Sequence, residues 1–193
     1  EYTVNFNINK YTVTFEAGEG GSLEGATEVT VDYGTELGTV TFPTPVAEEG
    51  YEFAGWSQES GTVTGDITVR ANFSKKQVTV TFAASEGGSR EGETEVTVDY
   101  GTDLKDVTFP AAKAEEGYNF IGWDKEEGAV TEDITVTASF EKKTYTVNFE
   151  VEANGTLIGE VSATVEHGDD LSTVEFPAVE ADHGYKFTGW SQE

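Results

Sequence analysis

The stretch Gly50-Tyr51-Glu52-Phe53-Ala54-Gly55-Trp56 is the densest aromatic segment of the chain, and it recurs at residues 117–123 and 184–190. Each copy follows the previous one by 67 residues, with no insertion or deletion. The same spacing separates the residues of two other series: Phe15, Phe82 and Phe149, and Pro43, Pro110 and Pro177. A fixed period of this size indicates tandem copies of one structural unit.

The copies differ in how similar and how complete they are. Residues 11–73 and 78–140 are identical at 43 of 63 positions, whereas the third copy is more divergent and stops before its counterpart of Asp66 to Phe73. Tyr2, Val4 and Phe6 fall in register with Val69, Ala71 and Phe73. We therefore predict a closing strand of a preceding repeat plus a connector at 1–10, repeat 1 at 11–76, repeat 2 at 77–143, and a truncated repeat 3 at 144–193, which lacks its last strand.

Alternation of apolar and polar residues predicts half-buried strands within each repeat. In the first copy the apolar positions are Tyr11, Val13 and Phe15; Val29, Val31 and Tyr33; Val40 and Phe42; and Ile67, Val69, Ala71 and Phe73. Turns are expected at residues 20–22, 43–45 and 49–50, where glycine and proline gather. Residues 34–38 are long enough for only a short helical turn. Each repeat is thus predicted to be a mainly β module.

Trp56 is out of phase with this alternation. Strict alternation places Tyr51 and Phe53 on one face and sends Trp56 to the other. A bulge at Gly55 would return the indole to the core, which is a common use of a glycine inside a strand. We interpret Trp56 as a core anchor. An exposed platform for sugar stacking is the alternative, although the neighbours Ala54, Ile121 and Thr188 offer few hydrogen bonds.

Composition excludes several classes of function. The 193 residues include 11 Lys+Arg and 37 Asp+Glu, a formal charge of −26, so binding to nucleic acid or anionic lipid is disfavoured. No apolar run is long enough to span a membrane, which predicts no membrane insertion. The absence of Cys excludes disulfides and thiolate chemistry. The absence of Met favours a piece excised from a longer polypeptide.

The chain offers no motif for catalysis. His167 and His183 occur only in the third copy, so an activity common to the repeats cannot use them. A metal held by these histidines with Asp169 or Asp182 is an alternative to ordinary turn histidines. Calcium bound by the abundant carboxylates is another, although no EF-hand-like loop is present and a solvated acidic face is the simpler interpretation. We predict no enzyme activity and no catalytic, cofactor-binding or metal-binding residue.

The order of the blocks is similar to a known family. Tyr-Thr-Val-Thr-Phe, Val-Asp-Tyr-Gly, Gly-Tyr-x-Phe-x-Gly-Trp and Asp-Ile-Thr-Val-x-Ala-x-Phe resemble the Listeria/Bacteroides repeat family, which includes the internalin B-repeats of bacterial surface proteins. The resemblance implies ubiquitin-like or SUMO-like β-grasp modules with a short or degenerate helix, repeated as a stalk in cell-surface adhesins. The acidic segment 16–28 is longer than usual. His167 replaces Tyr33 and Tyr100, which is expected to loosen the third repeat.

Short connectors separate the predicted repeats. The connectors Asn7–Lys10, Ser74–Gln77 and Glu141–Thr144 are four residues long, too short for flexible tethers, and they favour an elongated rod. Each copy has nine or ten more acidic than basic residues, and five of the eleven basic residues lie in the connectors: Lys10, Lys75, Lys76, Lys142 and Lys143. These lysines are expected to reduce repulsion between neighbouring repeats.

These observations predict a non-enzymatic structural stalk or spacer in an extracellular, cell-surface or secreted bacterial protein. The alternative is a module that binds a host or neighbouring surface protein or a glycan through an exposed sheet edge or face. A further expectation concerns residues 1–6, which could fill the vacant strand position in the third repeat of another molecule, giving head-to-tail self-association by strand addition. A frayed segment, or a local hairpin with residues 11–15, are the alternatives.

Overall fold

The computed structural model describes residues 1–191, so the last two residues of the predicted third repeat, 192 and 193, lie outside the described residues. The chain divides into two compact units, and the division runs through the second repeat. Unit 1 comprises Glu1–Val80, Glu95–Thr108 and Glu127–Ile134. Unit 2 comprises Thr81–Thr94, Phe109–Glu126 and the residues from Thr135 onward.

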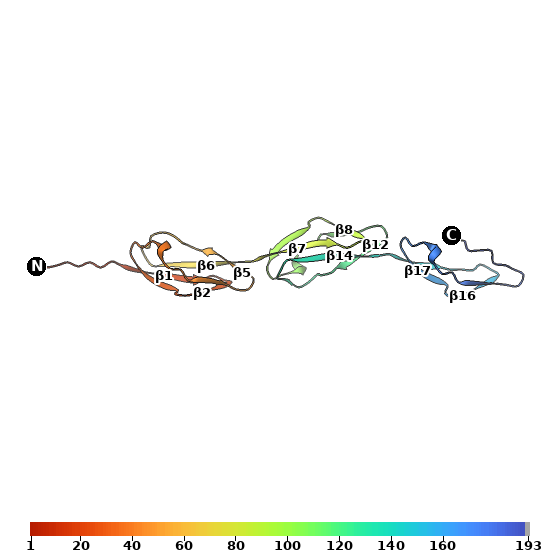
Figure 1. Ribbon diagram of the computed structural model, residues 1–193, viewed down its shortest axis with the longest axis horizontal. Helices are drawn as coiled ribbons and strands as arrows, with labels where there is room; N and C mark the ends of the chain where they lie inside the picture. Colours follow the sequence, from red (N-terminus) through yellow and green to blue (C-terminus); the bar gives the residue numbers. More distant parts are fainter. Residues whose placement is uncertain (192–193) are drawn as a thin grey trace. The chain divides into compact units, whose positions relative to one another are not determined.

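The first repeat lies in unit 1 and is built on a four-stranded sheet of order β3-β1-β6-β5 (Figure 1). Its strands are β1 (Lys10–Ala17), β3 (Glu28–Asp32), β5 (Tyr51–Trp56) and β6 (Ile67–Lys75). The central strands β1 and β6 are parallel, with Val13 opposite Ile67, whereas β3 and β5 pair antiparallel along the two edges. The predicted strands at the two ends of the repeat, β1 and β6, are therefore neighbours in the sheet.

A second, smaller sheet pairs β2 (Gly21–Glu24) with β4 (Thr44–Ala47). The turn predicted at 20–22 lies one residue earlier, at 19–20, whereas the turn predicted at 43–45 and the strand predicted at Val40 and Phe42 are wrong. Pro45 has no N–H, but it is tolerated because β4 pairs on one side only. The Phe42 ring packs 4.9 Å from the Phe15 ring, so side-chain packing positions residues 40–43 without a strand ladder.

The core of the first repeat consists of five buried side chains, Val13, Phe15, Leu37, Val63 and Val69, surrounded by half-buried hydrophobic residues. Leu37 opens a single 3-10 turn, η1 (Leu37–Thr39), which confirms a short helical turn in this region, displaced toward the end of the predicted span 34–38. Because a sheet buries only one face here, this turn supplies the apolar side chain that closes the core from the other side.

The predicted bulge beside Trp56 is confirmed. The register between β5 and β6 shifts between Phe53 and Gly55, and Gly55 has a φ of +114°. The extra residue returns the Trp56 indole to the core side, where its ring lies 5.6 Å from that of Phe15. The same shift occurs in unit 2 between Phe120 and Gly122, whose φ is +132°.

The other elements reproduce these local pairs. Gly21 opposite Ala47 in the β2–β4 pair corresponds to Gly88 opposite Ala114 and to Gly155 opposite Ala181, which lie 67 and 134 residues further on. The remaining bounds are β7 (Gln77–Ala84), β8 (Gly88–Glu91), β9 (Glu95–Asp99), β10 (Thr102–Asp103), η2 (Leu104–Asp106), β11 (Ala111–Ala114), β12 (Tyr118–Trp123), β13 (Ala129–Val130), β14 (Ile134–Lys142), β15 (Thr144–Asn148), β16 (Gly155–Ile158), β17 (Ser162–Glu166), η3 (Leu171–Thr173) and β18 (Ala178–Ala181). The 67-residue period of the sequence is therefore also a period of the structure.

The connectors are shorter than the sequence predicted. β6 ends at Lys75 and β7 begins at Gln77, so Lys76 alone separates them, and Lys143 alone separates β14 from β15. Both strands at the first joint extend into the predicted linker because Lys75 still pairs with Tyr51. Most of each predicted four-residue connector is therefore strand.

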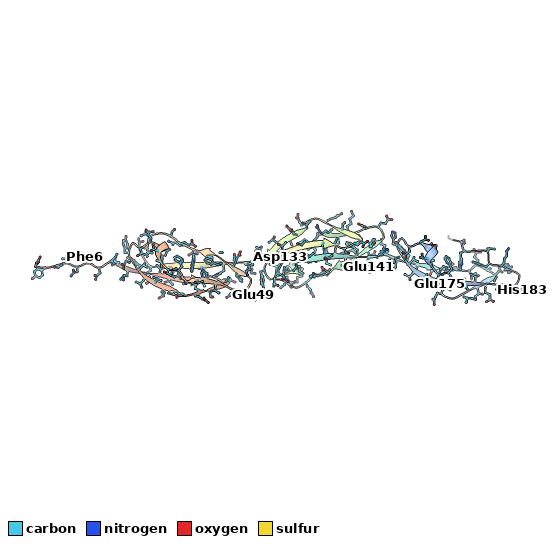
Figure 2. The ribbon with its side chains drawn as sticks, viewed as in Figure 1. Phe6, Glu49, Asp133, Glu141, Glu175 and His183 are labelled. Carbon is cyan, nitrogen blue, oxygen red and sulfur yellow. The ribbon has the colours of Figure 1, made fainter. Side chains whose placement is uncertain are left out.

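The N-terminal segment and the third repeat have less regular structure. Residues 1–9 form no strand, so the local hairpin with residues 11–15 is not formed, and Phe6 lies on the extended segment (Figure 2). Tyr185–Trp190 correspond to β5 but form no strand. In the first repeat β5 is held by β6, and no counterpart of β6 pairs with residues 185–190 among the described residues.

Candidate functional site

The aromatic side chains that the sequence singled out pack on one another. Phe15, Phe42 and Trp56 form a triad with ring centroids 4.9 to 5.6 Å apart, and Phe53 packs on the outer side of Trp56 at 5.7 Å. The equivalent triads are Phe82, Phe109 and Trp123, and Phe149, Phe176 and Trp190. Tilted and edge-on contacts at these distances are favourable aromatic geometries. The tryptophans are thus core anchors and not open stacking platforms.

The histidines and their proposed acidic partners do not converge on a site. Within residues 1–191 no group of three or more His, Asp or Glu side chains is placed to hold a metal ion. The Asp169 carboxylate instead accepts the Glu166 N–H at 2.8 Å, closing a turn. The His167 ring lies near the Tyr145 ring, with Nδ1 3.4 Å from the hydroxyl. His183 lies in the turn that precedes Tyr185.

Several carboxylates in the described part of the chain accept hydrogen bonds from backbone N–H groups. No charged side chain there is buried. Asp66 accepts the Thr12 N–H at 2.8 Å, and Asp133 accepts the Thr79 N–H at 2.7 Å. Asp103 caps η2, and hydrogen bonding from the Lys105 N–H and ammonium lowers the pKa of its carboxyl. Asp103 thus caps a helical turn, whereas Asp66 and Asp133 accept hydrogen bonds from distant strand residues, uses that residue type alone did not predict.

Two surface depressions lie in the third repeat. One has a volume of about 380 Å³ and is lined by the backbone and side chains of residues 150–155 and 186–191 among others, including Glu150, Lys186 and Trp190. It is open to solvent and holds no buried polar group. Its walls include Glu150 and Val151, counterparts of the end of β1, and residues 186–190, counterparts of β5; in the first repeat β6 lies between these two strands. The depression is therefore explained by strand pairing that this repeat lacks.

A contact between repeats, which sequence reasoning missed, is better organised. In unit 1 the Tyr100 ring of the second repeat lies directly against the backbone of Gly50 in the first, so a Cβ on Gly50 would overlap the ring. The Tyr100 hydroxyl donates to Glu49 Oε1 at 2.8 Å. Figure 2 shows Glu49 at the end of the first repeat opposite Phe6. Accepting this bond, the Glu49 carboxylate raises the pKa of the Tyr100 hydroxyl above its ordinary value.

The backbone of one residue joins the two sides of this contact. The Lys76 N–H donates to the Gly50 carbonyl at 2.8 Å, and the Lys76 carbonyl accepts the Tyr100 N–H at 2.8 Å. Gly50 itself has a φ of +79°, a conformation that favours glycine. A signal was present in the sequence, because Gly50 recurs as Gly117 and Gly184, and an aromatic ring recurs at Tyr33, Tyr100 and His167.

No helix among the described residues is long and apolar enough to cross a membrane. Comparison with known proteins shows what the chain is similar to. One relative, named "Putative membrane protein", from Evansella cellulosilytica, is 35% identical over 97% of this chain. A second from the same organism, named "Putative Gly-rich membrane protein", is 31% identical over 97%. The chain spans only 29% and 22% of the lengths of these two relatives.

Family models cover the chain from Tyr11 onward. The Listeria-Bacteroides repeat domain matches residues 11–77 and 145–193, and the divergent InlB B-repeat domain matches residues 78–144. The boundaries of these matches coincide with the 67-residue period, and the three matched segments share the β2–β4 type pair and the aromatic triad. The chain therefore belongs to the Listeria-Bacteroides repeat family.

Proposed function

We propose that this chain is a structural stalk or spacer in an extracellular protein that is secreted or held at the bacterial cell surface. The observation that carries the proposal is the joint: small β modules of one kind follow one another with a single residue, Lys76 or Lys143, between their strands. Such a joint restricts motion far more than a flexible linker does. The role is mechanical and requires no catalytic group.

Each repeat is proposed to be a β-grasp-like module. The proposed divisions of the chain are 1–10, 11–76, 77–143 and 144–193. Support comes from the first repeat, whose first and last strands are parallel neighbours in the middle of a mixed sheet with antiparallel strands outside them. The single 3-10 turn, η1, takes the place that a longer helix occupies in ubiquitin-like modules. Tandem modules of this kind are proposed to form an elongated rod.

Single-molecule energy transfer tests the spacer role. The chain has no Cys, so Ser60→Cys and Glu160→Cys place two unique dyes on exposed positions in the first and third repeats. For a spacer we expect one narrow distribution of the distance between the two dyes, unchanged between low and high salt. A control variant with eight Gly/Ser residues inserted after Lys76 is expected to broaden it. A broad, salt-dependent distribution in the parent chain would contradict the proposal.

A binding module is the second candidate. The observation that favours it is the pair of open edges in the first repeat, β3 and β5, together with the exposed rings of Phe53 and Phe120, each 40% exposed. Extended peptides bind sheet edges by adding a strand. Glycan arrays and pull-downs from host surface extracts with the full chain test it. Saturable micromolar binding that Phe53→Ser or Phe120→Ser abolishes would favour binding over spacing.

Self-association by strand addition also remains a proposal for the 193-residue chain. Tyr2 and Phe6 are 104% and 91% exposed, and the counterpart of β5 in the third repeat forms no strand. Residues 1–6 of one molecule could therefore pair beside residues 185–190 of another, a head-to-tail contact that propagates. Sedimentation at high concentration is expected to show oligomers that disappear when residues 1–6 are deleted. Equal masses for both chains would refute it.

A further inference from the structure

The contact between Gly50 and Tyr100 has a counterpart within unit 2. There the His167 ring lies against the backbone of Gly117, whose φ is +83°, so closely that a Cβ on Gly117 would overlap it. The backbone connections are the same as before. The Lys143 N–H donates to the Gly117 carbonyl at 2.8 Å, and the Lys143 carbonyl accepts the His167 N–H at 2.8 Å. Both joints thus consist of a turn glycine, a relay residue and a ring.

The ring and the glycine turn that form this contact each also occur without the other. Tyr33 occupies the position of Tyr100 in the first repeat, and its N–H donates to the Asn9 carbonyl at 2.8 Å as Tyr100 does to Lys76, yet its side chain is 53% exposed. Gly184 occupies the position of Gly50, with a φ of +91°, and apart from its chain neighbours no described residue has an atom within 4 Å of where its Cβ would be. Each half is therefore preformed before a partner is present.

We propose that the ring at positions 33, 100 and 167 is the contact by which each repeat recognises the glycine turn of the neighbouring copy, and that tyrosine holds this turn more tightly than histidine. The partner that fits the exposed Tyr33 ring is accordingly the Glu-Glu-Gly-Tyr turn of another copy of the repeat. This inference concerns the joint itself and stands whether the chain serves as a spacer or as a binding module.

Chemistry at the two joints accounts for the difference in strength. The Tyr100 hydroxyl extends past the glycine to a charge-assisted hydrogen bond with Glu49, a stronger class of bond than one between neutral groups. The second repeat has Glu116 at the position equivalent to Glu49, but His167 has no hydroxyl to place there, and its Nδ1 faces Tyr145 of its own repeat. The Tyr100 side chain therefore makes a hydrogen bond across its joint, whereas the described hydrogen bond of the His167 ring stays within its own repeat.

Amide hydrogen exchange in the full chain tests the recognition contact, because the Lys76 N–H donates to the carbonyl of Gly50, the glycine that the Tyr100 ring contacts. Tyr100→Ala is expected to accelerate exchange of this amide by about tenfold, as local opening becomes easier. The matched control is Tyr33→Ala, which removes the same side chain at the equivalent position and should leave the Lys76 amide within about twofold of the parent. An unchanged NMR resonance of the Trp123 indole N–H verifies that the second repeat still folds.

A gain-of-function variant separates recognition from simple damage to the fold. His167→Tyr is expected to slow exchange of the Lys143 amide several-fold, and adding Glu116→Gln should remove that gain by weakening the hydrogen-bond acceptor. Two outcomes would overturn the proposal: Tyr33→Ala that accelerates the Lys76 amide as much as Tyr100→Ala does, or His167→Tyr that leaves the Lys143 amide unchanged.

Discussion

The glycines of the first repeat meet different structural requirements. Gly55 provides a positive φ at a bulge and has open space around it, so only its backbone conformation is required. Gly50 provides both a positive φ and room for the ring of Tyr100. Gly65 has open space and no positive φ, so neither requirement applies. Gly50 and Gly55 accordingly recur in all three copies, whereas Gly65 is replaced by Glu132 in the second copy.

Alanine substitution tests whether the positive φ at position 55 requires glycine. Gly55→Ala is expected to lower the free energy of unfolding by about 1 to 3 kcal/mol, because an L residue is strained at this φ. Urea unfolding followed by tryptophan fluorescence measures the change. Gly65→Ala is the matched control and should leave stability within about 0.5 kcal/mol. Equal effects from both substitutions would show that backbone strain at the bulge is unimportant.

Burial distinguishes the aromatic residues of the first repeat. Phe15 is 2% exposed and sits between Phe42 and Trp56, whereas Phe53 on the opposite side of the bulge is 40% exposed. Phe15→Ala is expected to cost about 3 to 5 kcal/mol, the usual cost of a large cavity in a core. Phe53→Ala should cost clearly less. Because a repeat of this size has little stability to spare, the first variant should unfold the first repeat in dilute denaturant.

At the scale of elements, the first and second repeats are closed by their 3-10 turns as well as by their strands, whereas Leu171 of η3 is 39% exposed. Leu37 and Leu104, the first residues of η1 and η2, are buried at 0% and 3% exposure. The turns differ in how they are capped. In η2 the Asp103 carboxylate accepts the Lys105 N–H at 3.1 Å, and in η3 Asp170 accepts the Ser172 N–H at 2.8 Å, whereas Glu36 makes no such cap at η1.

The caps predict a pH dependence. The hydrogen bonds that the Lys105 N–H and ammonium donate lower the pKa of Asp103, and the Ser172 N–H lowers that of Asp170. A depressed folded-state pKa stabilises the fold above the carboxyl's ordinary value, and this contribution is lost as the pH falls through the folded-state pKa. NMR titration of the Asp103 carboxyl should show a midpoint below about 3.8, and Asp103→Asn should reduce the loss of stability on acidification. A midpoint at or above the ordinary value would contradict the cap.

At the scale of the whole molecule, charge is the dominant property. The formal charge of −26 arises from an excess of acidic residues in every repeat. Ion pairs offset little of it: Lys10 to Asp32 at 2.6 Å and Lys142 to Glu166 at 3.6 Å involve exposed side chains. Exposed pairs of this kind contribute at most about 1 kcal/mol each. Repulsion between like charges should therefore outweigh attraction in the folded chain.

Salt is accordingly expected to stabilise the protein. Raising NaCl from low concentration to about 0.5 M reduces the Debye length to a few ångströms, and the unfolding temperature should rise by several degrees as repulsion is screened. Differential scanning calorimetry measures the shift, and sucrose at equal osmolality controls for solvent effects unrelated to charge. A fall in the unfolding temperature with NaCl would mean that the joint lysines and other ion pairs dominate.

Sequence alone determined the repeat, the mainly β class and the bulge that returns Trp56 to the core, because periodicity and residue shape are local properties of a chain. It did not determine that β2 and β4 pair across Leu23 and Pro45, since glycine and proline there resemble turns until the partner strand is known. Nor did it show that Lys76 alone separates two strands. The meeting of Tyr100 with Gly50 could be decided only by the tertiary structure, because the two residues lie 50 positions apart and the Tyr100 ring reaches the Gly50 backbone only when neighbouring repeats are both folded.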